Sequence, residues 1–384
     1  MDTLLPGVGL DDADGLIAAD REGRLRHAAL SGAQVRAAAV AAEEGALSAV
    51  VASRPRSLVL VARRGAAVSA VHLVSAALAR EFVIPVVVTD HAPSWVGPLD
   101  VVVIAGDDPG DPVLVESVDR AGRRGCETVV IAPAGGPLQA AAAARAVSLP
   151  PRVTVPDQFA LAGFVAAIIT VIQSLRGGLH TGAGFDLMSC ADALDHEAML
   201  NHPQRDVYEN PAKSLAEKMI GHRTVLSGDS PGTRVIASHA SQAFVRVGGF
   251  LAPDADLAEV LNGLPLLVAS VPPDYDPLFH DPELDGPAPA APLCIVLLAT
   301  TQERTELERR AAMLRGNAVL VLPEHTGGAE IADAAQPGHQ AEGSGGIVAT
   351  AERDRGKMRE LCELMVLASR LEMAAVYLQM AGSH

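Results

Sequence analysis

Residues 99–132 read LDVVVIAGDDPGDPVLVESVDRAGRRGCETVVIA, and this stretch sets the architecture expected for the whole chain. An apolar run ends at Ala105, a turn of Gly, Asp and Pro follows, apolar residues then recur at helical spacing from Leu114, and a second apolar run ends at Ala132. The pattern predicts a strand, a helix and a second, parallel strand joined by a right-handed crossover. Because ligands of such sheets lie beyond the carboxyl ends of the strands, the turn from Gly106 to Asp111 indicates where a site should be sought.

The ends of this predicted helix carry specific signals. Asp111 can cap the first turn, and Pro112 can take the first helical position, where its missing N–H costs nothing. Gly125 stands where a helix C-terminus favours a left-handed residue. These signals support the interpretation of the stretch as strand, helix and strand.

The composition narrows the class of protein. A chain of 384 residues favours two or more domains. Hydrophobic residues make up 49% of it and aromatic residues only 3%, which suits helices packed on parallel strands. The formal net charge of −16 argues against a nucleic-acid partner and against an anionic membrane surface, since both need a basic face.

Neither an ordinary signal peptide nor a membrane span is expected. Residues 1–14 hold four aspartates and no basic residue. The longest apolar run, Phe159–Ile172, is shorter than the roughly 20 residues that cross a bilayer, so it predicts a buried helix. The four cysteines lie far apart without a CxxC spacing, which is typical of reduced thiols, and we expect a cytoplasmic protein.

The alternation of strand and helix extends through both halves of the chain. In the first half, strands of a parallel sheet of four or five are expected at Ser57–Val61, Phe82–Thr89, Val101–Ala105 and Val129–Ala132. Pro85 favours an edge position for the second of these. In the second half, strands are expected at His222–Ser227, Leu264–Ser270, Cys294–Thr300 and Ala318–Leu322.

This pattern predicts five parts. They are an N-terminal helical segment (residues 1–50), a first α/β domain (51–156), a helical connector (157–221), a second α/β domain (222–350) and a C-terminal helix (351–384). Residues 271–292, rich in Pro and Asp, are expected to form a long surface excursion within the second domain.

Four stretches resemble a known family: SLVLVARRGAAVSAVHLVSAAL from Ser57, the stretch at residues 99–132, NPAKSLAEKMIGHRTVLSGDSPGT from Asn210, and LCELMVLASRLEMAAVYLQMAG from Leu361. Over essentially the whole chain, their order resembles the tandem SIS (sugar isomerase) domain proteins. The likeness is greatest to the bifunctional phosphoglucose/phosphomannose isomerase family and its actinobacterial TobH-like branch. The resemblance implies an α/β fold of two tandem SIS domains, each a parallel sheet sandwiched by helices. It also implies a homodimer and a sugar-phosphate substrate.

No cofactor or metal is expected. The sequence has no P-loop and no GxGxxG after a strand. His196, Glu197 and His202 lack the i, i+4 histidine spacing of a zinc-binding helix.

Members of this family hold the substrate phosphate at the starts of helices in the first domain, with Ser and Thr hydroxyls and backbone N–H groups of a GxGGS turn and an SxSGxT turn. The matching turns here are ARRGA at residues 62–66 and AGDDPGD at residues 105–111. Neither has a hydroxyl, and the second carries three carboxylates that would repel a phosphate.

The arginines of the first turn allow two interpretations. Arg63 and Arg64 could hold a phosphate through the fork geometry of their guanidinium groups. Two further polar side chains could assist, Ser69 and His72. Alternatively, the arginines pair with Asp107 and Asp108 across the turn, and the protein's own charges fill the site.

The catalytic positions of the family are altered. Its base, a Glu in an NENAK-like segment, matches FVRVGGF at residues 244–250, which contains no acid. Its ring-opening His, in a PExxHNE-like segment, falls within residues 253–265, which contain acids but no His, and its terminal Lys has no counterpart. A relocated base could be Glu259 or Glu324, and Glu324 with His325 could act as acid and base or form part of a solvated loop.

The loop SGDSPGT at residues 227–233 retains hydroxyls. Ser227, Ser230 and Thr233 could face a sugar, or Ser230 could instead cap the helix that Pro231 begins.

Three functions remain open at this point. The first is a catalytically degenerate SIS-domain protein, a homodimer as the resemblance implies, that acts in the binding of carbohydrate derivatives or in regulation. The second is an active aldose–ketose isomerase with relocated groups. The third is a non-catalytic partner of an enzyme of mannose metabolism.

Overall fold

The computed structural model describes residues 7–50, 54–78, 82–143, 145–175, 185–268, 281, 284, 286, 288–314, 316–323 and 345–382, and only the backbone over residues 345–358. The contacts within the chain divide it into two compact units. The five-stranded unit comprises residues 22–200 and 323–370, and the four-stranded unit comprises residues 1–21, 201–322 and 371–384.

The five-stranded unit is built on a parallel sheet with the strand order β2-β1-β3-β4-β5. Its strands are β1 (Ser57–Ala62), β2 (Val86–Thr89), β3 (Asp100–Ala105), β4 (Glu127–Ile131) and β5 (Val147–Ser148). Every residue of β1 and β3 is buried, because helices cover both faces of the sheet.

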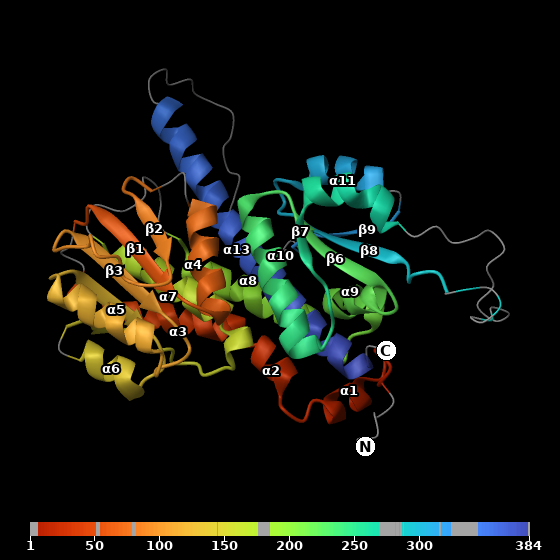
Figure 1. The fold of residues 1–384 in the computed structure, drawn as a ribbon, viewed down its shortest axis with the longest axis horizontal. Helices are drawn as coiled ribbons and strands as arrows, with labels where there is room; N and C mark the ends of the chain where they lie inside the picture. The colour runs from red at the N-terminus through yellow and green to blue at the C-terminus, as the bar shows by residue number, and fades with distance from the viewer. Residues whose placement is uncertain are drawn as a thin grey trace, which may run out of the picture. The chain divides into compact units, whose positions relative to one another are not determined.

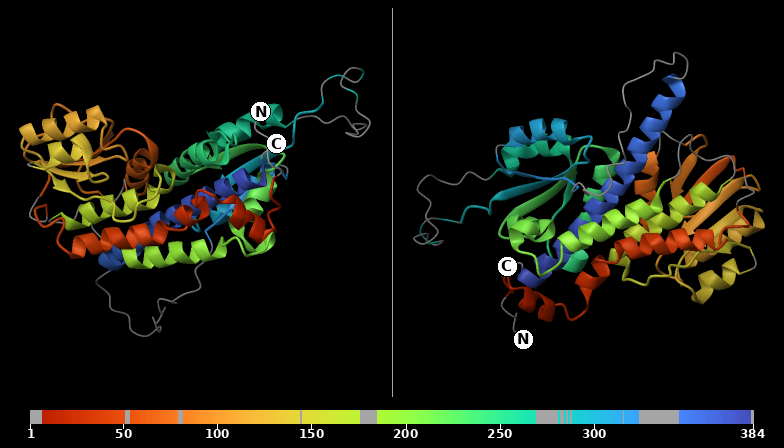
Figure 2. Two further views of the ribbon diagram at one scale, coloured as in Figure 1. Left: turned by 90° about the horizontal axis from the view of Figure 1, so that it is seen from below. Right: turned by 180° about the vertical axis from the view of Figure 1, so that it is seen from behind.

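Helices form layers on this sheet. They are α2 (Arg24–Ala28), α3 (Ser31–Glu43), α4 (Gly65–Leu78), α5 (Pro112–Arg123), α6 (Gly136–Ala142), α7 (Leu161–Ser174), which follows the short η1 (Asp157–Phe159), and α8 (Leu187–Leu200). Figure 1 shows α5 and α6 on one face of the sheet and α4 and α7 on the other. Helix α3 packs against both α7 and α8, which adds further layers on that side (Figure 2).

The predicted strand, helix and strand of residues 99–132 are confirmed as β3, α5 and β4. Asp111 caps α5 by accepting hydrogen bonds from the Val113 and Leu114 amides, and Pro112 is its first residue. Gly125 has a φ of 72°, the left-handed conformation expected there. The strand expected from Phe82 begins only at Val86, after Pro85, and it lies at the sheet edge as predicted.

The four-stranded unit also contains a parallel sheet, with the order β7-β6-β8-β9. Its strands are β6 (Arg223–Gly228), β7 (Asp254–Asp256), β8 (Leu293–Leu298) and β9 (Ala318–Val321). Its helices are α1 (Ala13–Ala19), α9 (Pro211–Met219), α10 (Pro231–Ala243), α11 (Leu257–Leu267) and α12 (Arg304–Ala311), with short turns η2 (Val207–Glu209), η3 (Phe244–Gly248) and η4 (Ala312–Leu314). Leu257 and Val260 of α11 and Leu307 of α12 share one core cluster with β8.

The strand predicted at Leu264–Ser270 is wrong: residues 257–267 form helix α11, and residues 269 and 270 lie outside the described part. Asp256 caps this helix through the Ala258 amide, and apolar residues recur at helical spacing from Leu257. The strand that completes the sheet is instead β7, three residues long and paired with β6.

Helix α13 (Gly345–Ala381) ends the described chain and contributes to both units. Apolar residues of this helix are buried: Leu361, Leu364, Met365, Ala368, Leu371, Ala375 and Leu378. Nowhere in the described ranges does a helix combine the length and the apolar character needed to cross a membrane. Parallel sheets flanked by helices confirm the predicted α/β fold class.

Candidate functional site

Two turns of the five-stranded unit meet at the carboxyl edge of its sheet. Arg63 and Arg64 follow β1, and the acidic turn of residues 107–111 follows β3. The two strands are parallel neighbours, with Ala62 opposite Ala105, so both turns leave the sheet at the same level. The strand order reverses at this point, since β2 lies on one side of β1 and β3 on the other. Ligands of open α/β sheets bind at such a switch point.

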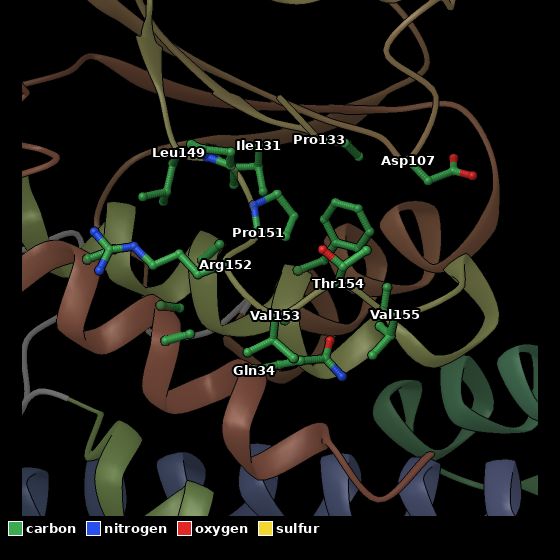
Figure 3. Close-up of a pocket in the computed structure, with 18 of the residues that line it drawn as sticks. Gln34, Asp107, Ile131, Pro133, Leu149, Pro151, Arg152, Val153, Thr154 and Val155 are labelled. Carbon is green, nitrogen blue, oxygen red and sulfur yellow. The ribbon is translucent and has the colours of Figure 1, made fainter. Parts of the chain in front are cut away.

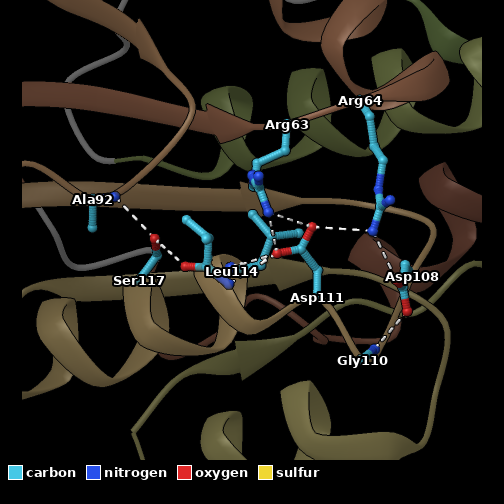
Figure 4. Close-up of polar contacts among 9 residues, drawn as sticks. Arg63, Arg64, Ala92, Asp108, Gly110, Asp111, Leu114 and Ser117 are labelled. Carbon is cyan, nitrogen blue, oxygen red and sulfur yellow. Dashed lines mark hydrogen bonds and ion pairs between the residues drawn. The ribbon is translucent and has the colours of Figure 1, made fainter.

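The arginines of the first turn are paired with acids of the second (Figure 4). Arg63 donates to both carboxylate oxygens of Asp111, at 2.8 and 3.0 Å. Arg64 donates to Asp108 at 2.8 Å and to Asp111 at 3.3 Å. The predicted pairing across the turn is therefore confirmed for Arg64 and Asp108, whereas Arg63 pairs with Asp111 and not with Asp107.

Asp111 is the centre of this network. Its side chain is 1% exposed and also accepts the Val113 and Leu114 amides, at 2.9 and 3.2 Å. Burial alone would raise the pKa of its carboxyl group, but the hydrogen bonds from Arg63 and from the two amides outweigh burial and hold that pKa below its ordinary value. The carboxylate thus occupies the position at the start of α5 where an anion would bind.

A second carboxylate caps α4 in the same unit. Asp157 accepts a hydrogen bond from the Ala66 amide at 3.1 Å. A Cβ on Gly65 would lie 2.3 Å from an Asp157 carboxylate oxygen, and Gly65 has a φ of 65°, so glycine is required there. We did not predict this role from the sequence, because Asp157 lies 91 residues beyond Ala66 and no motif connects them.

The remaining candidates of the five-stranded unit differ in exposure. Ser69 and His72 both lie on α4, where Ser69 is buried and His72 is exposed. Asp107 is partly buried, and burial, followed by the negative charge of Asp157, raises the pKa of its carboxyl group.

In the four-stranded unit, the hydroxyls of residues 230 and 233 form a capping box at the start of α10. Ser230 Oγ accepts the Thr233 amide at 3.2 Å, and Thr233 Oγ1 accepts the Ser230 amide at 3.1 Å. The predicted cap at Ser230 is confirmed. Next to it, Asp229 accepts two hydrogen bonds from Arg310, at 2.7 and 2.8 Å. Ser227 Oγ is buried and has no hydrogen-bond partner among the described residues.

Of the proposed catalytic residues, only Glu259 lies within the described part of the chain. Glu259 is exposed in the first turn of α11. Glu324 and His325 lie outside the described residues, as does most of the excursion at 271–292.

The stretch NPAKS at residues 210–214, which carries part of the family resemblance, has a structural explanation. Asn210 caps α9 by accepting the Lys213 amide at 2.9 Å. The Lys213 side chain is fully buried, and its ammonium group donates to the carbonyls of Pro203 and Arg205, at 2.6 and 2.9 Å. Burial lowers the pKa of Lys213, although Asp11 and Asp206 act in the opposite direction.

The capping interpretation of Ser230 predicts a specific loss of stability. Ser230→Ala should lower the free energy of unfolding by about 1 kcal/mol, because a helix cap is lost. Ser227→Ala should leave it unchanged or raise it, because a buried hydroxyl without a partner destabilises the fold. Denaturant titration of both variants tests this, and a Ser227→Ala variant less stable than Ser230→Ala would contradict it.

Comparison with known proteins supports the fold. No family model matches the sequence, and no curated protein matches it either. Among solved structures, the chain is similar to tagatose-6-phosphate ketose/aldose isomerase from Escherichia coli, with 14% identity, a TM-score of 0.56, and coverage of 94% of this chain and 95% of the other.

Two further solved structures are also similar to this chain over most of its length. Glucosamine-6-phosphate deaminase from Thermotoga maritima has 9% identity, a TM-score of 0.53, and coverage of 93% and 94%. The C-terminal domain of glucosamine-fructose-6-phosphate aminotransferase from Francisella tularensis has 10% identity, a TM-score of 0.52, and coverage of 85% and 84%. At these identities the likeness shows the fold: the chain has the SIS fold found in phosphosugar isomerases.

Proposed function

We propose that this chain is an SIS-fold binding or regulatory protein that does not catalyse aldose–ketose isomerisation. The observation that carries this proposal is the position of Asp111, whose buried carboxylate occupies the start of α5 and engages both Arg63 and Arg64. A phosphate placed there would have to displace this carboxylate from two amides and two guanidinium groups.

The charges around the switch point add to the argument. Four carboxylates, those of Asp107, Asp108, Asp111 and Asp157, face the two guanidinium groups of Arg63 and Arg64. The carboxylates outnumber the guanidinium groups, so the net charge of this set is negative, and a hexose 6-phosphate carries further negative charge. The repulsion between like charges in a partly desolvated cleft opposes phosphate binding.

Three helix starts that follow strands are already capped by side chains. Asp157 accepts an amide of α4, Asp111 accepts two amides of α5, and Ser230 accepts an amide of α10. Free amides at a helix start are what makes such a position attractive to a phosphate.

The segments that the resemblance assigns to catalysis form a helical turn, a helix cap and an ion pair in this structure. Residues 244–248 form the π-helical turn η3 and contain no acid. Asp256 caps α11 and pairs with Arg234, and Glu259 is exposed. A base needs to be positioned against its substrate and have a pKa suited to proton transfer.

The purified protein is therefore expected to isomerise glucose 6-phosphate and mannose 6-phosphate at well under about 1 turnover per second, below ordinary enzyme rates. A coupled assay with an active phosphoglucose isomerase as positive control measures this. Turnover above that rate would overturn the proposal in favour of an isomerase with relocated groups. Glu259→Gln and Glu324→Gln, made in parallel, would then show whether either residue is its base.

The assembly and the cellular role remain part of the proposal. We propose a homodimer, as family resemblance suggests. Light scattering of the purified chain distinguishes a dimer from a monomer. Assignment to the TobH-like branch and a role in mannose metabolism rest on the resemblance of sequence motifs alone.

A further inference from the structure

A cavity of about 430 Å³ lies within the five-stranded unit, beside the carboxyl end of β4 (Figure 3). Its walls come from α3, from the start of α7 and from the segment of residues 149–155. The volume falls in the range of small-molecule sites. Of the residues described above for the switch point, only Asp107 and Asp157 line this cavity.

The walls are mostly apolar and small. Helix α3 contributes Ala37, Ala38 and Ala41, and the opposite side contributes Phe164 and Ala167. Prolines, valines and Leu149 from residues 149–155, the segment that follows β5, also line the cavity. A hexose needs a hydrogen-bond partner for each buried hydroxyl, and this lining offers few. The cavity therefore suits a ligand with an apolar body.

Hydrogen bonds hold two of its walls in place. The Leu149 amide donates to the Val130 carbonyl at 2.8 Å, which ties the segment of residues 149–155 to β4. Gln34 Nε2 donates to the Phe159 carbonyl at 2.9 Å, which ties α3 to the turn before α7. A Cβ on Gly163 would lie 2.7 Å from Gln34 Oε1, so glycine makes room for this contact. The cavity is thus preformed.

The cavity has an acidic end. Asp107 and Asp157 both line it, and in Figure 3 Asp107 lies on the opposite side from Arg152. Arg152 forms an ion pair with Glu44, which satisfies its charge. Among the described residues, no side chain donates a hydrogen bond to the Asp107 carboxylate, whereas Asp157 accepts the Ala66 amide. Two carboxylates at one end repel each other, and a cation between them would remove that repulsion.

We propose that this cavity binds a small organic amine, protonated at neutral pH, whose apolar body fills the space between α3 and α7 and whose ammonium group lies against Asp107 and Asp157. The cavity shares Asp107 and Asp157 with the switch point, but the inference is independent of the proposed function, because amine binding requires neither a phosphate site nor its absence. A sugar phosphate is excluded from this cavity by the same carboxylates.

Three matched probes test the charge requirement by calorimetry on the full chain: 2-phenylethylamine, 2-phenylethanol and 3-phenylpropanoate. The amine should bind at least about 10-fold more tightly than the alcohol, a difference of about 1.4 kcal/mol. The carboxylate should not bind measurably. Equal binding of amine and alcohol, tighter binding of the carboxylate, or no binding of the amine would overturn the proposal.

Variants locate the site. Asp107→Asn should weaken amine binding about 10-fold and leave binding of the alcohol unchanged. Asp119→Asn is the matched control, because Asp119 lies on α5 outside the cavity lining and its loss changes the net charge equally. This control should bind the amine as the unchanged chain does, and equal losses in both variants would overturn the assignment.

A larger side chain that fills the cavity tests the site without changing its charge. Ala38→Leu should abolish binding of amine and alcohol alike. Val40→Leu, on the same helix but exposed and outside the lining, should change neither. Amine binding that survives Ala38→Leu in a folded protein, as judged by its melting temperature, would place the ligand elsewhere and overturn the proposal.

Discussion

Arg370→Met is expected to lower the free energy of unfolding by about 3–5 kcal/mol. Arg370 of α13 donates to both carboxylate oxygens of Glu197 on α8, each at 2.7 Å. The two side chains are only 4% and 1% exposed, so removal of the guanidinium group takes two charge-assisted hydrogen bonds away from a buried carboxylate. A urea titration followed by circular dichroism measures the loss.

A control on the same helix separates burial from charge. Arg359 pairs with Glu363 at 3.1 Å, but the Arg359 side chain is 64% exposed. Arg359→Met should therefore lower stability by no more than about 1 kcal/mol. The double variant Glu197→Leu with Arg370→Met should recover much of the loss, because both charges of this pair are then removed together. The prediction fails if Arg370→Met destabilises no more than Arg359→Met.

Much of the fold could be predicted because buried parallel strands leave a clear signal. The apolar runs of β3 and β4, together with the cap at Asp111, predicted the strand, helix and strand directly. Strand β5 consists of only Val147 and Ser148, which is too short to show any periodicity. The error at Leu264–Ser270 arose because a short apolar run fits a strand or a helix, and the cap at Asp256 decided for the helix.

The candidate site was predictable only where neighbouring strands bring residues together. Turns that follow adjacent parallel strands must meet, so a pairing of Arg63 and Arg64 with acids of the second turn could be expected. The choice of Asp111 over Asp107 depends on side-chain geometry at the helix start. Contacts between residues far apart in sequence left no local pattern, as with Glu197 and Arg370, which are 173 residues apart.

Asp111→Ser is expected to create a phosphate site that the natural chain lacks. Serine keeps a capping oxygen for α5. Loss of the carboxylate releases Arg63 from its ion pair and removes one negative charge that would repel a phosphate. Two unit charges about 8 Å apart interact by roughly 2 kcal/mol at an effective dielectric constant of about 20. The affinity for inorganic phosphate and for glucose 6-phosphate, measured by calorimetry, should therefore rise about 30-fold. Asp119→Ser, with the same change in net charge, should leave it unchanged.

The same variant has a pH signature whose sign follows from the pKa of Asp111. That pKa is held below the ordinary aspartate value of about 3.9, so the carboxylate stabilises the folded chain fully above that pH. Asp111→Ser should be less stable than the natural chain by about 1–2 kcal/mol at pH 7, because charge-assisted hydrogen bonds are lost. The difference should narrow as the pH falls below about 3.9, because the carboxylate of the unfolded chain is protonated first and that of the folded chain only at lower pH. The prediction of a new phosphate site is contradicted if the natural chain already binds glucose 6-phosphate as tightly as Asp111→Ser does. If Arg63→Met then abolishes that binding, the arginines bind the phosphate and the Asp111 carboxylate does not exclude it.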